Sequence, residues 1–211
     1  MYFNYFLNLI LHCRSGKTSI IKRFIGENFE SEYSPTTSPN YSVQEVKTKD
    51  RQVLLQVWEI PGHDQYLESF SGNFYRDFDC CLLLYDVTNS NSFQSLGQWL
   101  NEFTIQANPR SIGYFPVIVV GTKSDQNQNR QVSRLTAEKW CVLQQSSGNG
   151  FFSHMEVTAT KYSQIDYLFK QVARHVVRVE MAMNSVENRT ALEHRQMAMP
   201  NLHCCCCCNI L

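Results

Sequence analysis

Apolar and polar positions along the chain change repeatedly between a strand-like and a helix-like period. Strands are predicted over residues 3–11, 43–47, 53–58, 80–85 and 116–121, and the last two are continuous apolar runs, typical of buried central strands. Helical spacing predicts helices over residues 18–25, 93–106, 136–145 and 165–183. With a sixth strand ending near residue 156, these repeats predict an α/β fold: a doubly wound, mostly parallel six-stranded sheet flanked by helices. Ligands of such sheets bind at the carboxyl ends of the strands.

The periodic pattern fades after residue 183. Residues 184–203 are largely polar and predict a flexible linker between a domain over 1–183 and a separate cysteine-rich tail over 204–211. We therefore expect one folded domain followed by a flexible C-terminal tail.

Composition narrows the classes of partner. The 19 lysines and arginines balance 19 aspartates and glutamates, so we expect no nucleic acid among the partners. No basic segment precedes an apolar run at the N-terminus, so we expect no ordinary signal peptide. Five of the nine cysteines are consecutive and the others are scattered, which favours a reducing intracellular compartment over a disulfide scaffold.

A phosphate-binding loop is the first candidate site. Its Gly-Lys-Thr core lies in the segment formed by Ser15, Gly16, Lys17, Thr18 and Ser19. Backbone N–H groups of such a loop surround phosphate oxygens, Lys17 would reach the β- and γ-phosphates, and the Thr18 hydroxyl would bind Mg²⁺. The pattern also requires a glycine where this chain has Leu11.

A second candidate segment runs from Tyr33 to Thr36, in the loop after the first helix. Thr36 can place its hydroxyl on Mg²⁺ and its N–H on a γ-phosphate, and Phe29 can pack on the edge of a base. The alternative for this segment is a proline turn between a helix and a strand.

A third segment follows the strand that ends near Trp58. Glu59 can hold the Mg²⁺ shell, the Gly62 N–H can approach the γ-phosphate, and His63 stands where an enzyme would orient the attacking water. An ordinary turn at a strand end is the alternative.

Two further segments lie at the ends of later strands, and their residues predict a guanine-binding site. The Asp125 carboxylate can accept from both N1–H and N2–H₂ of guanine, an arrangement that adenine cannot match, while the Lys123 stem lies along the base. The backbone N–H of Ala159 can donate to guanine O6. Neighbouring members of the two segments are Thr122, Thr158 and Thr160.

Taken together and in this order, the five segments resemble the Ras superfamily of small GTPases over residues 13–179. Phe74-Tyr75-Arg76 and the stretch 83–88 resemble Rab proteins. The stretches 79–81, 102–110, 130–132 and 140–141 are similar to the late-endosomal and lysosomal Rab subgroup.

This resemblance implies a P-loop GTPase domain that switches between GTP and GDP with Mg²⁺. It also implies effector proteins, an exchange factor and a GTPase-activating protein in vesicle traffic. Cys13 and Arg14 take positions in the phosphate loop, and Thr18, Thr36 and Glu59 take the metal positions. Tyr41, Trp58 and Phe74 correspond to the aromatic patch that effectors contact, with packing between strand and helix as the alternative.

Several positions depart from the family pattern. His63 replaces the glutamine that orients water, Glu59 replaces an aspartate, and Pro61 fixes φ in a loop that must move. In the base site Thr122 replaces an asparagine and Thr160 a lysine. These departures predict a slow GTPase with His63 as the catalytic residue. A pseudo-GTPase adaptor with weak or static nucleotide binding is the alternative, and a P-loop ATPase or nucleotide kinase is a distant third.

The N-terminal segment matches the family poorly before Cys13. Asn8 falls inside a strand that should be buried, and Leu11 stands at a glycine position. Either the phosphate loop is genuinely weakened, or residues 1–12 are a mis-assembled start; the peptide 11–14, found in the native protein, would reject the second explanation.

The tail predicts a lipid anchor. Cys208 begins a C-terminal C-a-a-X pattern ending in leucine, which favours geranylgeranyl, and the family adds Cys207 as a second site. Prenylation escort machinery is then a partner, and the cytoplasmic face of late endosomes or lysosomes is the expected location. Because one chain gives only marginal membrane binding, several lipids are expected. A metal-binding or oxidised cysteine run is the alternative.

Overall fold

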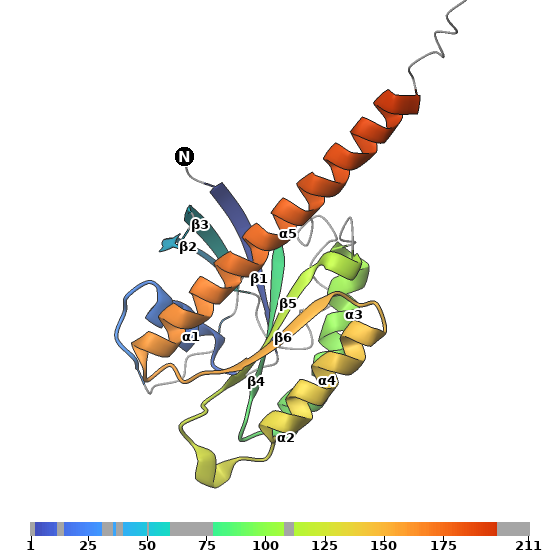
Figure 1. Ribbon diagram of the computed structural model, residues 1–211. Helices are drawn as coiled ribbons and strands as arrows, with labels where there is room; N and C mark the ends of the chain where they lie inside the picture. Colours follow the sequence, from blue (N-terminus) through green and yellow to red (C-terminus); the bar gives the residue numbers. More distant parts are fainter. Residues whose placement is uncertain are drawn as a thin grey trace, which may run out of the picture.

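The computed structural model describes residues 3–11, 15–30, 36, 40–49, 51–59, 78–107 and 112–197. Of residues 3–11, 107, 112 and 184–197 it gives the backbone alone. Figure 1 shows a sheet with helices on both faces, as the sequence predicts.

The sheet has six strands in the order β2-β3-β1-β4-β5-β6. β2 and β3 form an antiparallel pair, and the other pairs are parallel. The predicted doubly wound, mostly parallel sheet is confirmed. The strands are β1 (Phe3–Leu11), β2 (Asn40–Lys47), β3 (Gln52–Glu59), β4 (Cys80–Asp86), β5 (Pro116–Thr122) and β6 (Phe151–Glu156).

Helices cover both faces of the sheet (Figure 1). One core cluster joins the sheet to the first and last helices, and a second joins its other face to the helices between β4 and β6. The helices are α1 (Lys17–Phe24), α2 (Ser90–Gln94), α3 (Leu96–Ala107), α4 (Arg134–Ser146) and α5 (Tyr162–Met197), with 3-10 turns η2 (Ile112–Tyr114) and η3 (Asn127–Asn129).

β4 shows why continuous apolar runs predict central strands. Cys80, Leu82 and Leu84 belong to the cluster with α1 and α5, whereas Cys81, Leu83 and Tyr85 belong to the cluster with α3 and α4. All six side chains are fully buried. The two cysteines are therefore small core residues, and burial raises the pKa of both thiols.

The region predicted as one helix over 93–106 contains two. α2 begins three positions earlier, at Ser90, because Asn89 caps it by accepting a hydrogen bond from the Asn91 N–H. Ser95 then separates α2 from α3.

The predicted end of the last helix at residue 183 is wrong. α5 continues to Met197, so the backbone of residues 184–197, the first part of the predicted linker, is helical, and the flexibility of the linker stays a prediction. The segment holds no glycine or proline and is rich in good helix formers, which favours a helix even though its sequence lacks a periodic apolar pattern. Among the described residues, none of the helices combines the length and apolar character needed to cross a membrane.

Candidate functional site

The phosphate-loop segment leads directly into α1. Gly16 occupies the N-cap with φ 83° and ψ 22°, a left-handed conformation that a glycine adopts without strain. Ser15 and Lys17 are buried, and Thr18 and Ser19 follow in the first turn. The first turn of α1 contains no acidic residue, so its N–H groups are suited to an anion.

Three oxygen-bearing side chains from three separate segments meet beside this turn. The Thr18 hydroxyl donates to Glu59 Oε1 at 2.5 Å, and the Thr36 hydroxyl donates to the same oxygen at 3.2 Å. The two hydroxyl oxygens are 3.1 Å apart. The structure thus brings together the three residues predicted to hold a metal.

This cluster fits Mg²⁺ by its donor chemistry and by two of its three oxygen separations. Mg²⁺ prefers oxygen ligands at about 2.0–2.1 Å in octahedral geometry, which places neighbouring ligand oxygens about 2.9 Å apart. The Thr18–Thr36 and Thr36–Glu59 separations, 3.1 Å and 3.2 Å, are close to that value, whereas the 2.5 Å between Thr18 and Glu59 is shorter. Glu59, at the end of β3, is only 5% exposed, so its carboxylate is held in place by the sheet.

The segment after β5 is fixed by contacts with its neighbours. Lys123 has φ 56°, which is uncommon for a residue other than glycine. Its ammonium group donates to Asp86 Oδ2 at 2.5 Å, at the end of β4. Asp125, two positions on, is exposed, as a residue that reads a bound base must be.

Thr122 links the two sides of the site. Its hydroxyl lies 2.7 Å from the Ser15 carbonyl oxygen and 3.0 Å from the Tyr85 carbonyl oxygen, and the residue is 3% exposed. A hydroxyl has one proton, so it serves one carbonyl at a time. Thr122 therefore ties the end of β5 to the phosphate-loop segment.

The segment after β6 forms a compact turn beside that of β5. The hydroxyls of Thr158 and Thr160 are 2.9 Å apart, and the Thr158 N–H donates to the Gln164 side chain at 2.8 Å. Ala159 is half-buried between them. Phe29, after α1, is 44% exposed and available to a ligand.

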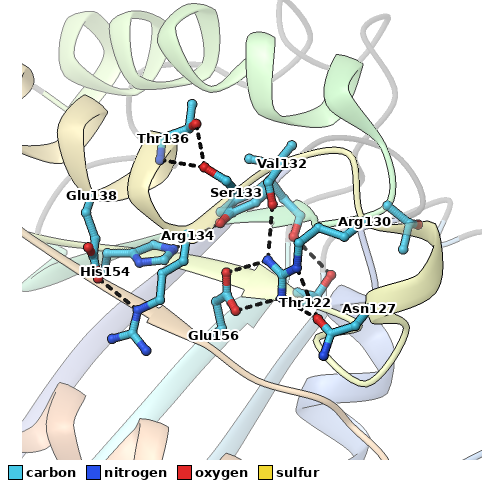
Figure 2. A network of polar contacts seen from close by, with 12 residues as sticks. Thr122, Asn127, Arg130, Val132, Ser133, Arg134, Thr136, Glu138, His154 and Glu156 are labelled. Carbon is cyan, nitrogen blue, oxygen red and sulfur yellow. Dashed lines mark hydrogen bonds and ion pairs between the residues drawn. The ribbon is translucent and has the colours of Figure 1, made fainter.

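An ion-pair network lies behind these two segments. Arg130 binds Glu156 (Figure 2). His154 contacts the Tyr85 hydroxyl at 3.0 Å through Nε2. Burial lowers the pKa of His154, whose Nδ1 is buried without a hydrogen-bond partner in the described part of the chain.

Two of the predicted aromatic-patch residues are in contact. The rings of Tyr41 and Trp58 stack at 4.9 Å, and Tyr41 is 53% exposed. Tyr41, on β2, is therefore accessible to a partner protein, while Trp58, on β3, is half-buried beneath it.

Several predicted residues lie outside the described residues. They are Cys13, Arg14, Tyr33, Gly62, His63, Phe74, Cys207 and Cys208.

Sequence reasoning missed the roles of Asp86, Arg130 and Glu156. Asp86 could have been found, since it ends a buried strand as Glu59 does. The pairing of Arg130 with Glu156 joins residues 26 positions apart, and no local pattern predicts it.

Comparison with known proteins agrees with this geometry. Residues 9–178 match the Ras family, and the chain belongs to that family. Over 75% of its length it is 37% identical to Ras-related protein Rab-7a of Paramecium octaurelia, of which it covers 74%. Over 78% of its length it is 36% identical to Ras-related protein Rab7 of Drosophila melanogaster, covering 76%, and 34% identical to Ypt/Rab-type GTPase Rab7 of Neurospora crassa, covering 78%.

Within the Ras family, the chain is a Rab GTPase of the Rab7 subgroup. It is accordingly a GTP-hydrolysing enzyme of a family that binds GTP and GDP, typically with Mg²⁺. Members of this family act in traffic with effectors, exchange factors and GTPase-activating proteins.

Proposed function

We propose that this chain is a membrane-anchored GTP/GDP switch of late-endosomal or lysosomal traffic that hydrolyses GTP slowly. The observation that carries the proposal is the meeting of Thr18, Thr36 and Glu59 at the N-terminus of α1. A γ-phosphate orders two segments in such switches. Thr36 lies in the first of them, and Glu59 lies at the start of the second.

Each part of the site has a distinct task in this proposal. Lys17 and the N–H groups of residues 15–19 hold the phosphates, and Asp125 and Ala159 bind guanine. Thr18, Thr36 and Glu59 hold Mg²⁺, which supplies charge neutralisation at the β- and γ-phosphates when bound. Phe29 and Tyr33 flank the base and the phosphates, respectively.

Slow hydrolysis follows from the residue at position 63. A glutamine there orients the attacking water in the family, and imidazole has a different reach and a different set of donors and acceptors. Pro61 also removes a backbone donor from the same loop. Both changes reduce the placement of water beside the γ-phosphate.

Anchoring relies on lipids at Cys207 and Cys208. The backbone of α5 runs from the edge that carries the candidate site towards the opposite edge of the sheet (Figure 1). A tail that leaves there keeps the switch face turned away from the membrane.

A pseudo-GTPase adaptor is a second candidate, and one contact favours it. The Glu59 carboxylate, one methylene longer than the family's aspartate, accepts from the Thr18 hydroxyl at 2.5 Å and from the Thr36 hydroxyl at 3.2 Å. Mg²⁺ would compete with these hydrogen bonds for the same three oxygens.

Release of fluorescent GDP, with and without EDTA, separates the two candidates. The switch predicts slow release with Mg²⁺ and at least about tenfold faster release once EDTA removes it. An adaptor predicts no binding, or release that EDTA leaves unchanged. Glu59→Asp, which shortens the carboxylate, is the matched variant and should increase the dependence on Mg²⁺.

A further inference from the structure

A network of side-chain contacts joins Arg130 to the end of β6 (Figure 2). Arg130 Nη1 donates to Glu156 Oε1 at 2.7 Å, and Nη2 donates to Oε2 at 2.9 Å. The side chains are only 22% and 14% exposed. Two parallel bonds between a guanidinium and a carboxylate fix orientation as well as distance.

The remaining donors of Arg130 bind the loop that carries Asp125. Nη1 also donates to the Val132 carbonyl at 3.1 Å, while Nε and Nη2 donate to Asn127 Oδ1 at 3.1 Å and 3.0 Å. The same loop is continued by backbone bonds from Gln126 to Lys123 and from Asn129 to Gln126. One side chain therefore holds both ends of the turn that begins beside Asp125.

Glu156 lies equally close to the other base segment. It ends β6 two positions before Thr158, and the Val157 N–H donates to the Gly121 carbonyl at 2.8 Å. A Cβ at Gly121 would be 3.1 Å from Glu156 Cγ and 2.8 Å from the Tyr85 hydroxyl. The glycine thus allows Glu156 to pack against β5 at the base of both segments.

We propose that Arg130 and Glu156 are positioning residues that set the preference for guanine. They hold the loop of Asp125 at a fixed distance from the turn of Ala159, so that a carboxylate and a backbone N–H meet neighbouring groups on one edge of the base, the carboxylate at N1–H and N2–H₂ and the N–H at O6. This inference rests on the proposed guanine-nucleotide function. It adds that specificity depends on a pair that does not touch the ligand.

The test measures the ratio of affinities for GDP and inosine diphosphate, by competition with a fluorescent GDP on the full chain. Inosine diphosphate lacks the 2-amino group, so the ratio reports how well Asp125 is placed. Arg130→Gln should reduce the ratio about tenfold, the scale of one hydrogen bond to a charged group. Arg130→Lys, which keeps the charge but not the planar fork, should lie between.

Arg134→Gln is the matched control. It removes an exposed arginine, at 67% side-chain exposure, whose ion pair in the described residues is with Glu138 on α4 at 2.8 Å and not with Glu156. The ratio should be unchanged. Glu156→Gln, which keeps the shape of the side chain, provides the same test if Arg130→Gln does not fold.

The outcomes separate this inference from the function on which it rests. A ratio that stays at the parental value in Arg130→Gln or Glu156→Gln overturns the positioning role, as does an equal loss of both affinities together with a lower melting temperature. A parental chain that binds no guanine nucleotide overturns the proposed function, and this inference with it.

Discussion

The base half and the phosphate half of the site differ in what holds their polar groups. In the base half, the segments after β5 and β6 are tied to the rest of the fold: Thr122 contacts the Ser15 carbonyl, Lys123 binds Asp86, and Arg130 binds Glu156. In the phosphate half, Thr18, Thr36 and Glu59 contact one another.

The departures from the family pattern have different consequences in the two halves. Thr122, in place of an asparagine, still ties β5 to the phosphate-loop segment through a shorter side chain. Glu59, in place of an aspartate, accepts hydrogen bonds from Thr18 and Thr36, two hydroxyls that are themselves candidate metal ligands. In the base half, the substituted side chain still has a partner within the fold. In the phosphate half, the substituted side chain is itself a candidate ligand, so the substitution changes the chemistry of the site.

The largest effect is expected in the phosphate half from Lys17→Ala. Loss of the buried ammonium removes charged hydrogen bonds to the phosphates, and GDP affinity should fall about 100-fold. Equilibrium binding of fluorescent GDP measures it. Lys22→Ala is the control, since Lys22 lies on α1 and pairs with Glu30 at the surface. Comparable losses in both variants would contradict the role of Lys17.

The next effect concerns hydrolysis, through His63→Gln. Restoring the family residue should raise the single-turnover rate of GTP hydrolysis about ten- to a hundredfold, the cost of misplacing a reacting group. GDP affinity should stay constant because His63 is not expected to contact the nucleotide. An unchanged rate would remove His63 as the cause of slow hydrolysis.

In the base half, Thr122→Val tests whether the Thr122 hydroxyl links the end of β5 to the phosphate-loop segment. The variant keeps the shape but leaves two buried carbonyls without this donor, so it should lower the free energy of unfolding by about 1–3 kcal/mol. It should also weaken GDP binding. Thr122→Ser retains the hydroxyl and serves as control, and equal stability of both variants in urea would argue against the tie.

The smallest effect is a pH dependence at His154, behind the base half. Burial lowers its pKa, so the unfolded chain binds the proton first and stability falls as pH drops below about 6.5. The groups facing it are Tyr85, Glu156, Glu138, Arg134 and Arg130. In His154→Gln the loss of stability between pH 7.5 and 5.5 should be smaller, by an amount on the order of a few tenths of a kcal/mol given solvent screening. Urea titrations of both chains at pH 7.5 and at pH 5.5 measure the two losses of stability. Equal losses in the parental chain and in His154→Gln would contradict the prediction.

The sequence predicts the sheet well because burial leaves a direct pattern. Residues such as Val117 and Val119 are buried on one face and Ile118 and Val120 on the other, which gives the continuous apolar run of β5. The same pattern is silent for residues 184–197, where helix formation depends on propensity and not on an apolar face.

The candidate site was predictable only in part. Motif spacing identifies Thr18, Thr36 and Glu59. Thr18 lies in the first turn of α1, Thr36 lies between α1 and β2, and Glu59 ends β3. The ion pairs Lys123–Asp86 and Arg130–Glu156 depend on β4, β5 and β6 being neighbours in the sheet. The pattern of apolar residues predicts which strands are buried, but it does not predict the order of the strands. Partners that lie far apart in the sequence are therefore determined by the topology of the sheet.

The measurement that tests the central claim most directly is the nucleotide carried by the purified protein. Gentle denaturation releases it, and chromatography identifies it. We expect GTP at close to one per chain, because the phosphate half binds despite Leu11 and His63 slows hydrolysis. Predominantly GDP would contradict slow hydrolysis, and no nucleotide, with the first segment confirmed by mass spectrometry, would contradict the switch itself.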